Sequence, residues 1–189
     1  EEWNEVVKGH LYGHFYCTKF ACMAMRQQRY GRIINTSSLA GLGNMAQANY
    51  SAAKEGIVGL TRTVARDMGR YGVRCNAIRP QAGTRLPQNI VVAALARGQE
   101  AQAKMLQGFM AANPPEAIAP LVVWLCTDEA ANVSGRTFLV TGTRIGLYSE
   151  PEVIADVQSD HGWSVDELSK LLPAQVTKGL VNPFAPKEE

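Results

Sequence analysis

The sequence has few cysteines, and their arrangement is not that of metal ligands. They form no C-x-x-C pair, and no group of cysteines and histidines has the spacing of a zinc site. This argues against a disulfide-stapled secreted scaffold and against a zinc domain, so we expect no metal. We interpret the four cysteines as reduced thiols of a cytoplasmic protein: Cys17, Cys22, Cys75 and Cys126.

The sequence also lacks an excess of charge and a long apolar run. The formal net charge is only +2, and the longest apolar stretches, such as IAPLVVWLC at 118–126, are too short to span a bilayer. Neither nucleic acid nor a membrane is therefore an expected partner. With 189 residues, 46% of them hydrophobic, the chain has the size and composition of one soluble globular domain.

Short apolar, β-branched runs alternate with longer segments whose apolar residues recur at helical spacing. The former predict strands, and the latter predict helices. The expected order is helix 2–28, strand 32–36, helix 48–69, strand 73–78, an irregular loop over 81–93, helices 94–111 and 115–126, and strand 136–142. Strands separated by helices indicate an α/β fold with a doubly wound parallel sheet, covered by helices on both faces.

The last part of the chain, 147–189, is expected to be a short helical extension of the domain formed by residues 1–146. Two serines stand three residues before a glutamate, the spacing of a helix-capping box. They predict short helices that begin after Ser149 and Ser164. The final residues, 182–189, are proline-rich and charged, and should be extended or frayed.

Tyr50 and Lys54 are four residues apart at the start of the predicted helix 48–69. On a helix this spacing places both side chains on one face. A nearby ammonium group favours the ionised form of a phenol, which suits general acid–base chemistry on an alcohol or ketone. The alternative is a half-buried aromatic residue beside a solvated lysine, and the context must decide between the two.

Polar side chains gather where the predicted strands end. Ser37 and Ser38 directly follow one strand, and Tyr50 and Lys54 begin the helix after it. Ligands of open α/β sheets bind beyond the carboxyl ends of the strands. A serine hydroxyl and the tyrosine phenol could therefore contact one substrate oxygen there, with the lysine behind them.

Five segments together resemble the short-chain dehydrogenase/reductase family. They are W-x-x-V-x-x-x-H-L-x-G (3–13), GRIINTSS (31–38), QANYSAAK (47–54), CNAIRP (75–80) and FLVTG (138–142). The resemblance covers nearly the whole chain up to about residue 146. It implies a Rossmann-like fold and hydride transfer between NAD or NADP and a small-molecule substrate that is interconverted between a secondary alcohol and a ketone.

Within the family, the sequence looks most like the (3R)-hydroxyacyl-CoA dehydrogenase unit of multifunctional β-oxidation enzymes. The similar segments are CNAI, P-x-A-G-T-R (80–85) and APLVVWLC. This likeness implies an acyl-thioester substrate. Hydroxysteroid dehydrogenases and ketoacyl-thioester reductases are close alternatives, so a steroid-like substrate stays open.

The resemblance assigns roles to single residues. Tyr50 matches the acid–base residue, and Lys54 matches the lysine that tunes it and hydrogen-bonds the nicotinamide ribose. Ser38 matches the substrate-positioning serine, because counting forward from GRII favours it; Ser37, which has the family's usual distance of thirteen residues from the tyrosine, is the alternative. His10 occupies the position of a catalytic asparagine; it could take part in a water relay to the lysine, or it could be a helical histidine without a role.

The segment after strand 73–78 matches the family's loop over the nicotinamide. The family usually has Pro-Gly here, whereas this chain has Pro80-Gln81-Ala82-Gly83-Thr84. Thr84 is the nearest candidate for the hydroxyl that touches the cofactor. The cofactor-binding residues implied by the resemblance are Tyr50, Lys54, Pro80, Gln81, Gly83 and Thr84.

The segment 41–46 matches the dinucleotide fingerprint G-x-G-x-x-A between a strand and a helix. The fingerprint also needs an acidic residue about 20 positions later, at the end of the next strand, and that strand ends in Ile78-Arg79-Pro80. We therefore interpret this loop as the turn that carries the serine. The family's own phosphate loop, T-G-x-x-x-G-x-G, is not in the sequence, so we expect an N-terminally truncated domain.

Two functions remain as hypotheses. The first is an NAD(P)-dependent oxidoreductase. The second is a non-catalytic fragment of the same fold that provides an association surface. The helices 2–28 and 48–69 match the pair that forms dimer contacts in the family, so a homodimer or homotetramer is implied in either case.

Overall fold

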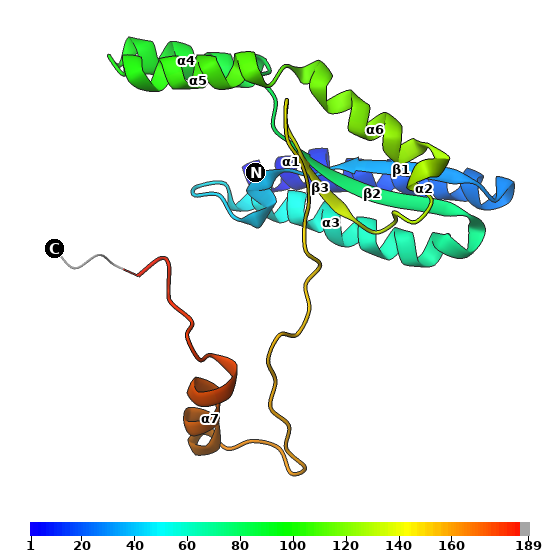
Figure 1. Ribbon diagram of the computed structural model, residues 1–189, viewed down its shortest axis with the longest axis vertical. Coiled ribbons are helices and arrows are strands. Elements are labelled where there is room, and N and C mark those ends of the chain that lie inside the picture. Colours follow the sequence, from blue (N-terminus) through cyan, green and yellow to red (C-terminus); the bar gives the residue numbers. More distant parts are fainter. Residues whose placement is uncertain (186–189) are drawn as a thin grey trace. The chain divides into compact units, whose positions relative to one another are not determined.

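The computed structural model describes residues 1–185, and of residues 85–87 it gives only the backbone (Figure 1). The chain separates into two compact units, Glu1–Ser149 and Glu150–Glu189. Each unit is described by itself. The first contains the sheet and the residues of the candidate site.

A four-stranded sheet forms the centre of the first unit, in the order β1-β2-β3-β4. The strands are β1 (Gly31–Thr36), β2 (Val73–Pro80), β3 (Thr137–Val140) and β4 (Ile145–Leu147). The first three run parallel, which confirms the expected α/β sheet, and β4 returns antiparallel to β3. This last strand is absent from the prediction because a three-residue strand carries too little pattern to recognise. The parallel strands place their carboxyl ends along one edge of the sheet.

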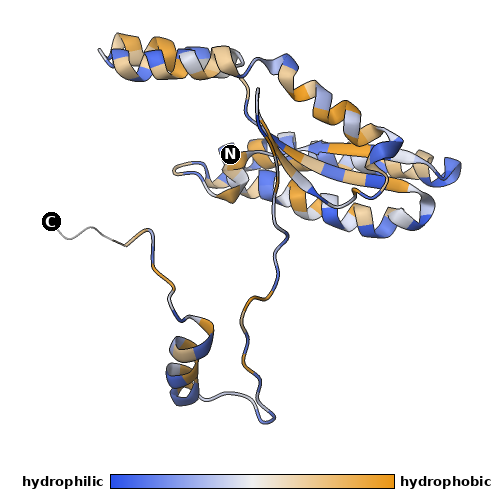
Figure 2. Cartoon of the chain, in the orientation of Figure 1, coloured by the Kyte–Doolittle hydropathy of each residue, from blue (hydrophilic) through white to orange (hydrophobic). Residues whose placement is uncertain are grey.

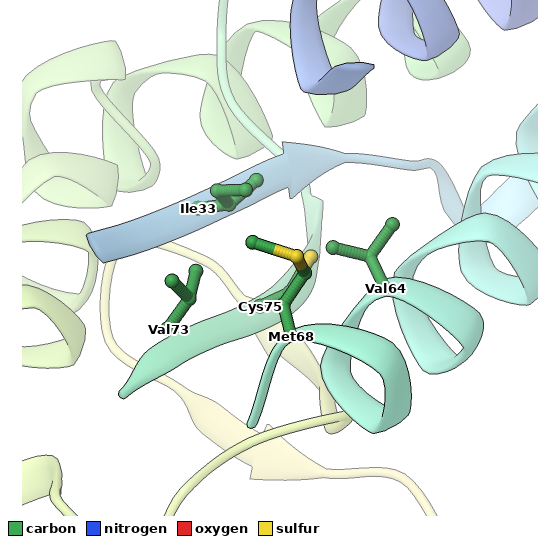
Figure 3. Packing of buried hydrophobic residues seen from close by; sticks show 5 residues of the cluster. All are labelled: Ile33, Val64, Met68, Val73 and Cys75. Carbon is green, nitrogen blue, oxygen red and sulfur yellow. The ribbon is translucent and has the colours of Figure 1, made fainter. Parts of the chain in front are cut away.

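Helices cover both faces of this sheet, as a doubly wound fold requires. The helices α2 (Gly13–Gln28) and α3 (Ala48–Met68) pack on one face, and α6 (Ala119–Cys126) packs on the other. Figure 3 shows the first of these cores, in which strand residues meet the C-terminal half of α3. Its buried members are Ile33, Val64, Met68, Val73 and Cys75. Hydrophobic residues lie along the strands and on the helices packed against them (Figure 2).

The expected helix over 2–28 forms, but it is not regular. It consists of α1 (Glu2–Val7), one π-helical turn (Lys8–Tyr12) and α2. The π turn packs on α3 opposite Gly56, where a β-carbon would lie 3.1 Å from the Leu11 side chain. The glycine thus makes room for the widened turn. Such single π turns are frequent at functional sites.

The segment between β2 and α6 differs from the prediction. An irregular loop was expected over 81–93, whereas the structure has a helical hairpin of α4 (Arg85–Ala96) and α5 (Glu100–Ala112). The prediction of a loop is wrong for residues 85–93. Pro87 lies in the first turn of α4, where a proline removes no helical hydrogen bond. Gly98, with φ of 69°, then separates the two helices.

Short 3₁₀ turns complete the first unit. They are Leu39–Leu42, Gly69–Tyr71, Pro115–Ile118 and Asp128–Ala130. No single helix within residues 1–185 is long and apolar enough to cross a membrane. The bent pair Glu100–Ala112 and Pro115–Cys126 meets the length and composition criteria only when both helices are taken together.

The second unit contains one α-helix, α7 (Val165–Leu171), and a π turn, Leu172–Val176. The Ser164 capping box is confirmed: its hydroxyl accepts from the Glu167 amide, and its own amide donates to that carboxylate. The helix expected after Ser149 is wrong. Val153 and Ile154 are 83% and 89% exposed, so no packing stabilises a short helix there. Of the expected extended end, residues 186–189 lie outside the described residues.

Leu125 provides a test of the core under α6. Its side chain is fully buried against β2 and β3, so Leu125→Ala should lower the free energy of unfolding by about 2–5 kcal/mol. The matched substitution Leu95→Ala removes a leucine that is 49% exposed in α4 and should change it by about 0.5 kcal/mol or less. Urea unfolding followed by circular dichroism measures both. Equal losses would contradict this placement of the core.

Candidate active site

Three connecting segments follow the carboxyl ends of the parallel strands. Residues 37–47 follow β1, residues 81–84 follow β2, and residues 141–144 follow β3. The parallel register, with Thr36 beside Ile78 and Pro80 beside Val140, brings these segments to the same edge of the sheet. This edge is where an open α/β sheet binds its ligands.

Tyr50 and Lys54 lie in the first turns of α3, and the structure brings them together as their spacing predicts. The Lys54 ammonium is 5.5 Å from the centroid of the Tyr50 ring. Lys54 is only 5% exposed, and its ammonium donates a 3.0 Å hydrogen bond to the Thr36 carbonyl at the end of β1. Burial lowers the pKa of Lys54. The lysine is therefore fixed to the sheet and is not a solvated surface group.

The two candidate serines have different surroundings. Ser37 is buried, and its hydroxyl donates a 2.7 Å hydrogen bond to the Lys54 carbonyl. Ser38 is half-buried, and its hydroxyl accepts a hydrogen bond from the Ala40 amide at 3.2 Å. Within residues 1–185 the Ser38 hydroxyl has no acceptor for its own proton. Ser37 therefore has a structural partner, whereas Ser38 keeps a donor for a ligand.

His10 lies in the π turn and is half-buried beside Tyr50. The two rings are 5.1 Å apart between centroids, in an edge-to-face arrangement at 81°. Burial, followed by the positive charges of Lys54 and His14, lowers the pKa of His10. A neutral imidazole has one donor and one acceptor nitrogen, as a relay of hydrogen bonds requires. The neighbouring His14 ring donates to the His10 carbonyl at 2.6 Å.

The segment expected to bind the cofactor is held by backbone hydrogen bonds. The Gln81 amide donates to the Val140 carbonyl at 2.9 Å, which extends the pairing of Pro80 in β2. A β-carbon at Gly83 would lie 2.6 Å from backbone atoms of Met110 in α5, so only glycine fits this approach. Thr84 is exposed and precedes α4 without a capping hydrogen bond from its side chain. Its hydroxyl is therefore accessible to a ligand.

Asn113 is a positioning residue that the sequence reasoning missed. Its carbonyl accepts from the Gly83 amide at 2.7 Å, and its side-chain oxygen accepts from the Gly142 amide at 2.8 Å. Asn113 thus joins the segment after β2 to the segment after β3. The only signal in the sequence is an asparagine before two prolines, which indicates a turn and says nothing about its partners.

Arg79 is the second residue that the sequence reasoning missed. It lies in β2, is 3% exposed, and donates to the Ser38 carbonyl at 2.8 Å and to the Glu55 carboxylate at 2.7 Å. Two arginines, Arg74 and Arg79, within a strand that is expected to be buried were a usable signal, because buried charges are almost always paired. Within residues 1–185 no group of three or more histidine, cysteine, aspartate or glutamate side chains is arranged to hold a metal ion.

Comparison with known proteins places this geometry in a family. Residues 1–142 match the family model described as enoyl-(acyl carrier protein) reductase. The chain is 37% identical over 182 residues to the hydroxyacyl-CoA dehydrogenase ChsB1 of Mycobacterium tuberculosis, covering 91% of this chain and 55% of that protein. The chain belongs to the short-chain dehydrogenase/reductase family.

Other members of the family agree with this placement. The peroxisomal multifunctional enzyme type 2 of Mus musculus is 40% identical over 147 residues, which cover 77% of this chain and 18% of that protein. The crystal structure of a short chain dehydrogenase from Mycobacterium avium superposes with a TM-score of 0.74 at 36% identity, over 94% of this chain and 56% of that chain. The chain therefore spans about half the length of ChsB1 and of that dehydrogenase.

The lowered pKa of His10 has a consequence for stability. Below the ordinary histidine pKa of about 6.5, the unfolded chain binds a proton that the folded His10 does not. The free energy of unfolding should therefore fall as the pH falls from about 6.5, and His10→Asn should make this dependence shallower. Urea unfolding at several pH values measures the slope.

His161 provides the matched control for this measurement. It is exposed in the second unit, so His161→Asn should leave the slope unchanged. Identical slopes for the wild type and His10→Asn would contradict the assigned burial of His10.

Proposed function

We propose that the whole protein is an NAD(P)-dependent oxidoreductase that interconverts a secondary alcohol and a ketone. The observation that carries this proposal is the buried Lys54 ammonium, bound to the Thr36 carbonyl and 5.5 Å from the Tyr50 ring. A lysine held in this way presents a fixed donor and a fixed positive charge on the helix face that carries the phenol, and this arrangement suits a proton-transferring tyrosine.

The side chains at this edge divide the proton chemistry among them. The Tyr50 phenol exchanges a proton with the substrate oxygen, and the Lys54 ammonium lies 5.5 Å from the centroid of its ring. The Ser38 hydroxyl donates a hydrogen bond to the same oxygen. His10 connects Lys54 to solvent through a relay of hydrogen bonds. The nicotinamide of NAD or NADP supplies or accepts the hydride.

The residues present fit the nicotinamide end of such a cofactor. Lys54 has two further N–H donors besides the one bound to Thr36, and these suit the ribose hydroxyls. Gly83 lets the segment after β2 pass close to α5, and the Thr84 hydroxyl is exposed beside it. Pro80 and Gln81 fix the start of that segment on the sheet.

The substrate class that we propose is a 3-hydroxyacyl thioester, with a hydroxysteroid as the alternative. The names of ChsB1 and of the (3R)-3-hydroxyacyl-CoA dehydrogenase of Homo sapiens, 33% identical over 149 residues, support an acyl-CoA. The hairpin α4–α5 also exposes large apolar side chains that suit an acyl chain or a steroid. They are Ile90, Val92, Leu95, Met105 and Phe109. The free cysteines support a cytoplasmic location.

Tyr50→Phe in the full-length protein tests this function. Loss of the phenolic proton should lower turnover of a 3-hydroxyacyl-CoA or hydroxysteroid with NAD or NADP by about 10²–10⁴-fold. Tyr30→Phe, which removes the hydroxyl of an exposed tyrosine next to β1, should retain full turnover. Steady-state absorbance at 340 nm measures both. An active Tyr50→Phe enzyme would end the proposal.

A second proposal concerns association, and it holds for an enzyme or for a non-catalytic module. The α1–α2 helix exposes a row of large apolar side chains between residues 3 and 23. They are Trp3, Tyr12, Phe15, Tyr16, Phe20 and Met23. Exposed apolar surface of this extent is typical of a protein–protein interface. We propose that this row and α3 pair with a second copy of the chain in a homodimer or homotetramer.

Phe20 is 63% exposed in this row, so Phe20→Glu should place a charge in the interface and shift the protein to the monomer. Ile154→Glu, at an exposed apolar residue of the second unit, should leave the mass unchanged. Sedimentation equilibrium measures the mass of each variant. A wild-type protein that is already monomeric would refute the association surface.

A further inference from the structure

We propose that Arg79 is a positioning residue. It holds the serine segment, residues 37–47 after β1, against helix α3 and thereby sets where the Ser38 hydroxyl meets the substrate oxygen. The inference rests on the proposed function of Ser38. Arg79 lies behind the serine in β2, and its contact with this segment is to the Ser38 backbone carbonyl.

The Arg79 guanidinium joins two separate elements of the site. One nitrogen, Nη1, donates to the Ser38 carbonyl at 2.8 Å, and the other, Nη2, donates to the Glu55 carboxylate at 2.7 Å. Glu55 follows Lys54 directly in α3. The arginine therefore connects the serine segment to the helix that carries Tyr50 and Lys54. A lysine has a single point charge in place of this planar fork and cannot hold the two partners in the same way.

The surroundings make this geometry rigid. Arg79 is almost fully buried, and the ring of Tyr148 lies 5.1 Å from its guanidinium carbon. Its Nε is buried and has no acceptor within the described residues. Without the Glu55 carboxylate, whose side chain is 42% exposed, the buried guanidinium would lose its counter-charge, which is unfavourable. The ion pair therefore keeps Arg79 in this one orientation.

Gly41 shows how closely the serine segment is seated on the ion pair. A β-carbon there would lie 2.7 Å from Arg79 Nη1 and 2.9 Å from Glu55 Oε2. The Gly41 amide also donates to the Ser38 carbonyl at 3.1 Å, so this carbonyl accepts two hydrogen bonds. These two hydrogen bonds restrain the peptide plane that follows Ser38 and therefore the backbone position from which its side chain extends.

Nothing in this arrangement gives the ion pair a chemical step of its own. Its effect should therefore be on the rate of the reaction and not on coenzyme binding. A displacement of about 1 Å at a reacting group can cost about 100-fold in rate. Replacing Arg79 should therefore lower kcat and change KM for the coenzyme very little.

Arg79→Lys in the full-length protein is the first test. It retains the charge but loses the fork, and we expect kcat to fall by about 10- to 100-fold while KM for NAD or NADP changes by less than about twofold. Arg32→Met is the matched control, because it removes another strand arginine with an ion pair, to Asp128, in a different part of the sheet. It should retain the wild-type kcat.

Gly41→Ala is the second test, and it leaves all charges in place. Its β-carbon should displace the ends of the Arg79 and Glu55 side chains and reproduce the kcat loss of Arg79→Lys. Gly69→Ala, at a helical glycine whose β-carbon would have open space, is the matched control and should leave kcat unchanged.

Hydrogen exchange provides a readout that does not depend on activity. In Arg79→Lys and Gly41→Ala, the amides of residues 39–43 should exchange faster than in the wild type, and those of the β2 core should not. Unchanged exchange and unchanged kcat in both variants would overturn the inference. If Tyr50→Phe stays active, the proposed function fails, and unchanged exchange would then still refute the role of Arg79 in holding the serine segment.

Discussion

The hydrogen bonds between Lys54 and the end of β1 are the contact on which the rest of the site depends. The lysine ammonium donates to the Thr36 carbonyl, and the next residue, Ser37, donates its hydroxyl to the Lys54 carbonyl. Helix α3 is thus attached to the strand both through its side chain and through its backbone. This double attachment fixes the height of Tyr50 above the sheet edge and places it beside His10. Because the lysine is buried, water does not compete for the bond.

Much of the fold could be predicted from the sequence, because its strands and long helices have strong local patterns. The run RIINT and the segment 48–69 formed as expected, and the Ser164 capping box was read correctly. The errors have physical causes that lie outside the local pattern. Ser149 has the same capping spacing, but its segment has no apolar surface to pack on, so no helix forms there.

The candidate site likewise contains residues that a local pattern predicts and residues that no local pattern predicts. The pair Tyr50 and Lys54 is recognisable because a helix turns a spacing of four into a contact. Arg79 and Asn113 act through partners 24 to 41 residues away, so no local spacing indicates what they bind. The difference between Ser37 and Ser38 also cannot be seen in the sequence. The Ser37 hydroxyl is bound to the Lys54 carbonyl, whereas the Ser38 hydroxyl has no acceptor for its proton within the described residues.

The bond between Gly83 and Asn113 has a mechanical consequence for the hairpin α4–α5. These two residues lie just before and just after the hairpin, and their backbones are joined at 2.7 Å. A hairpin that is closed at its base in this way can differ in length or sequence without moving the segments after β2 and β3, because its two ends stay joined to each other and to Gly142.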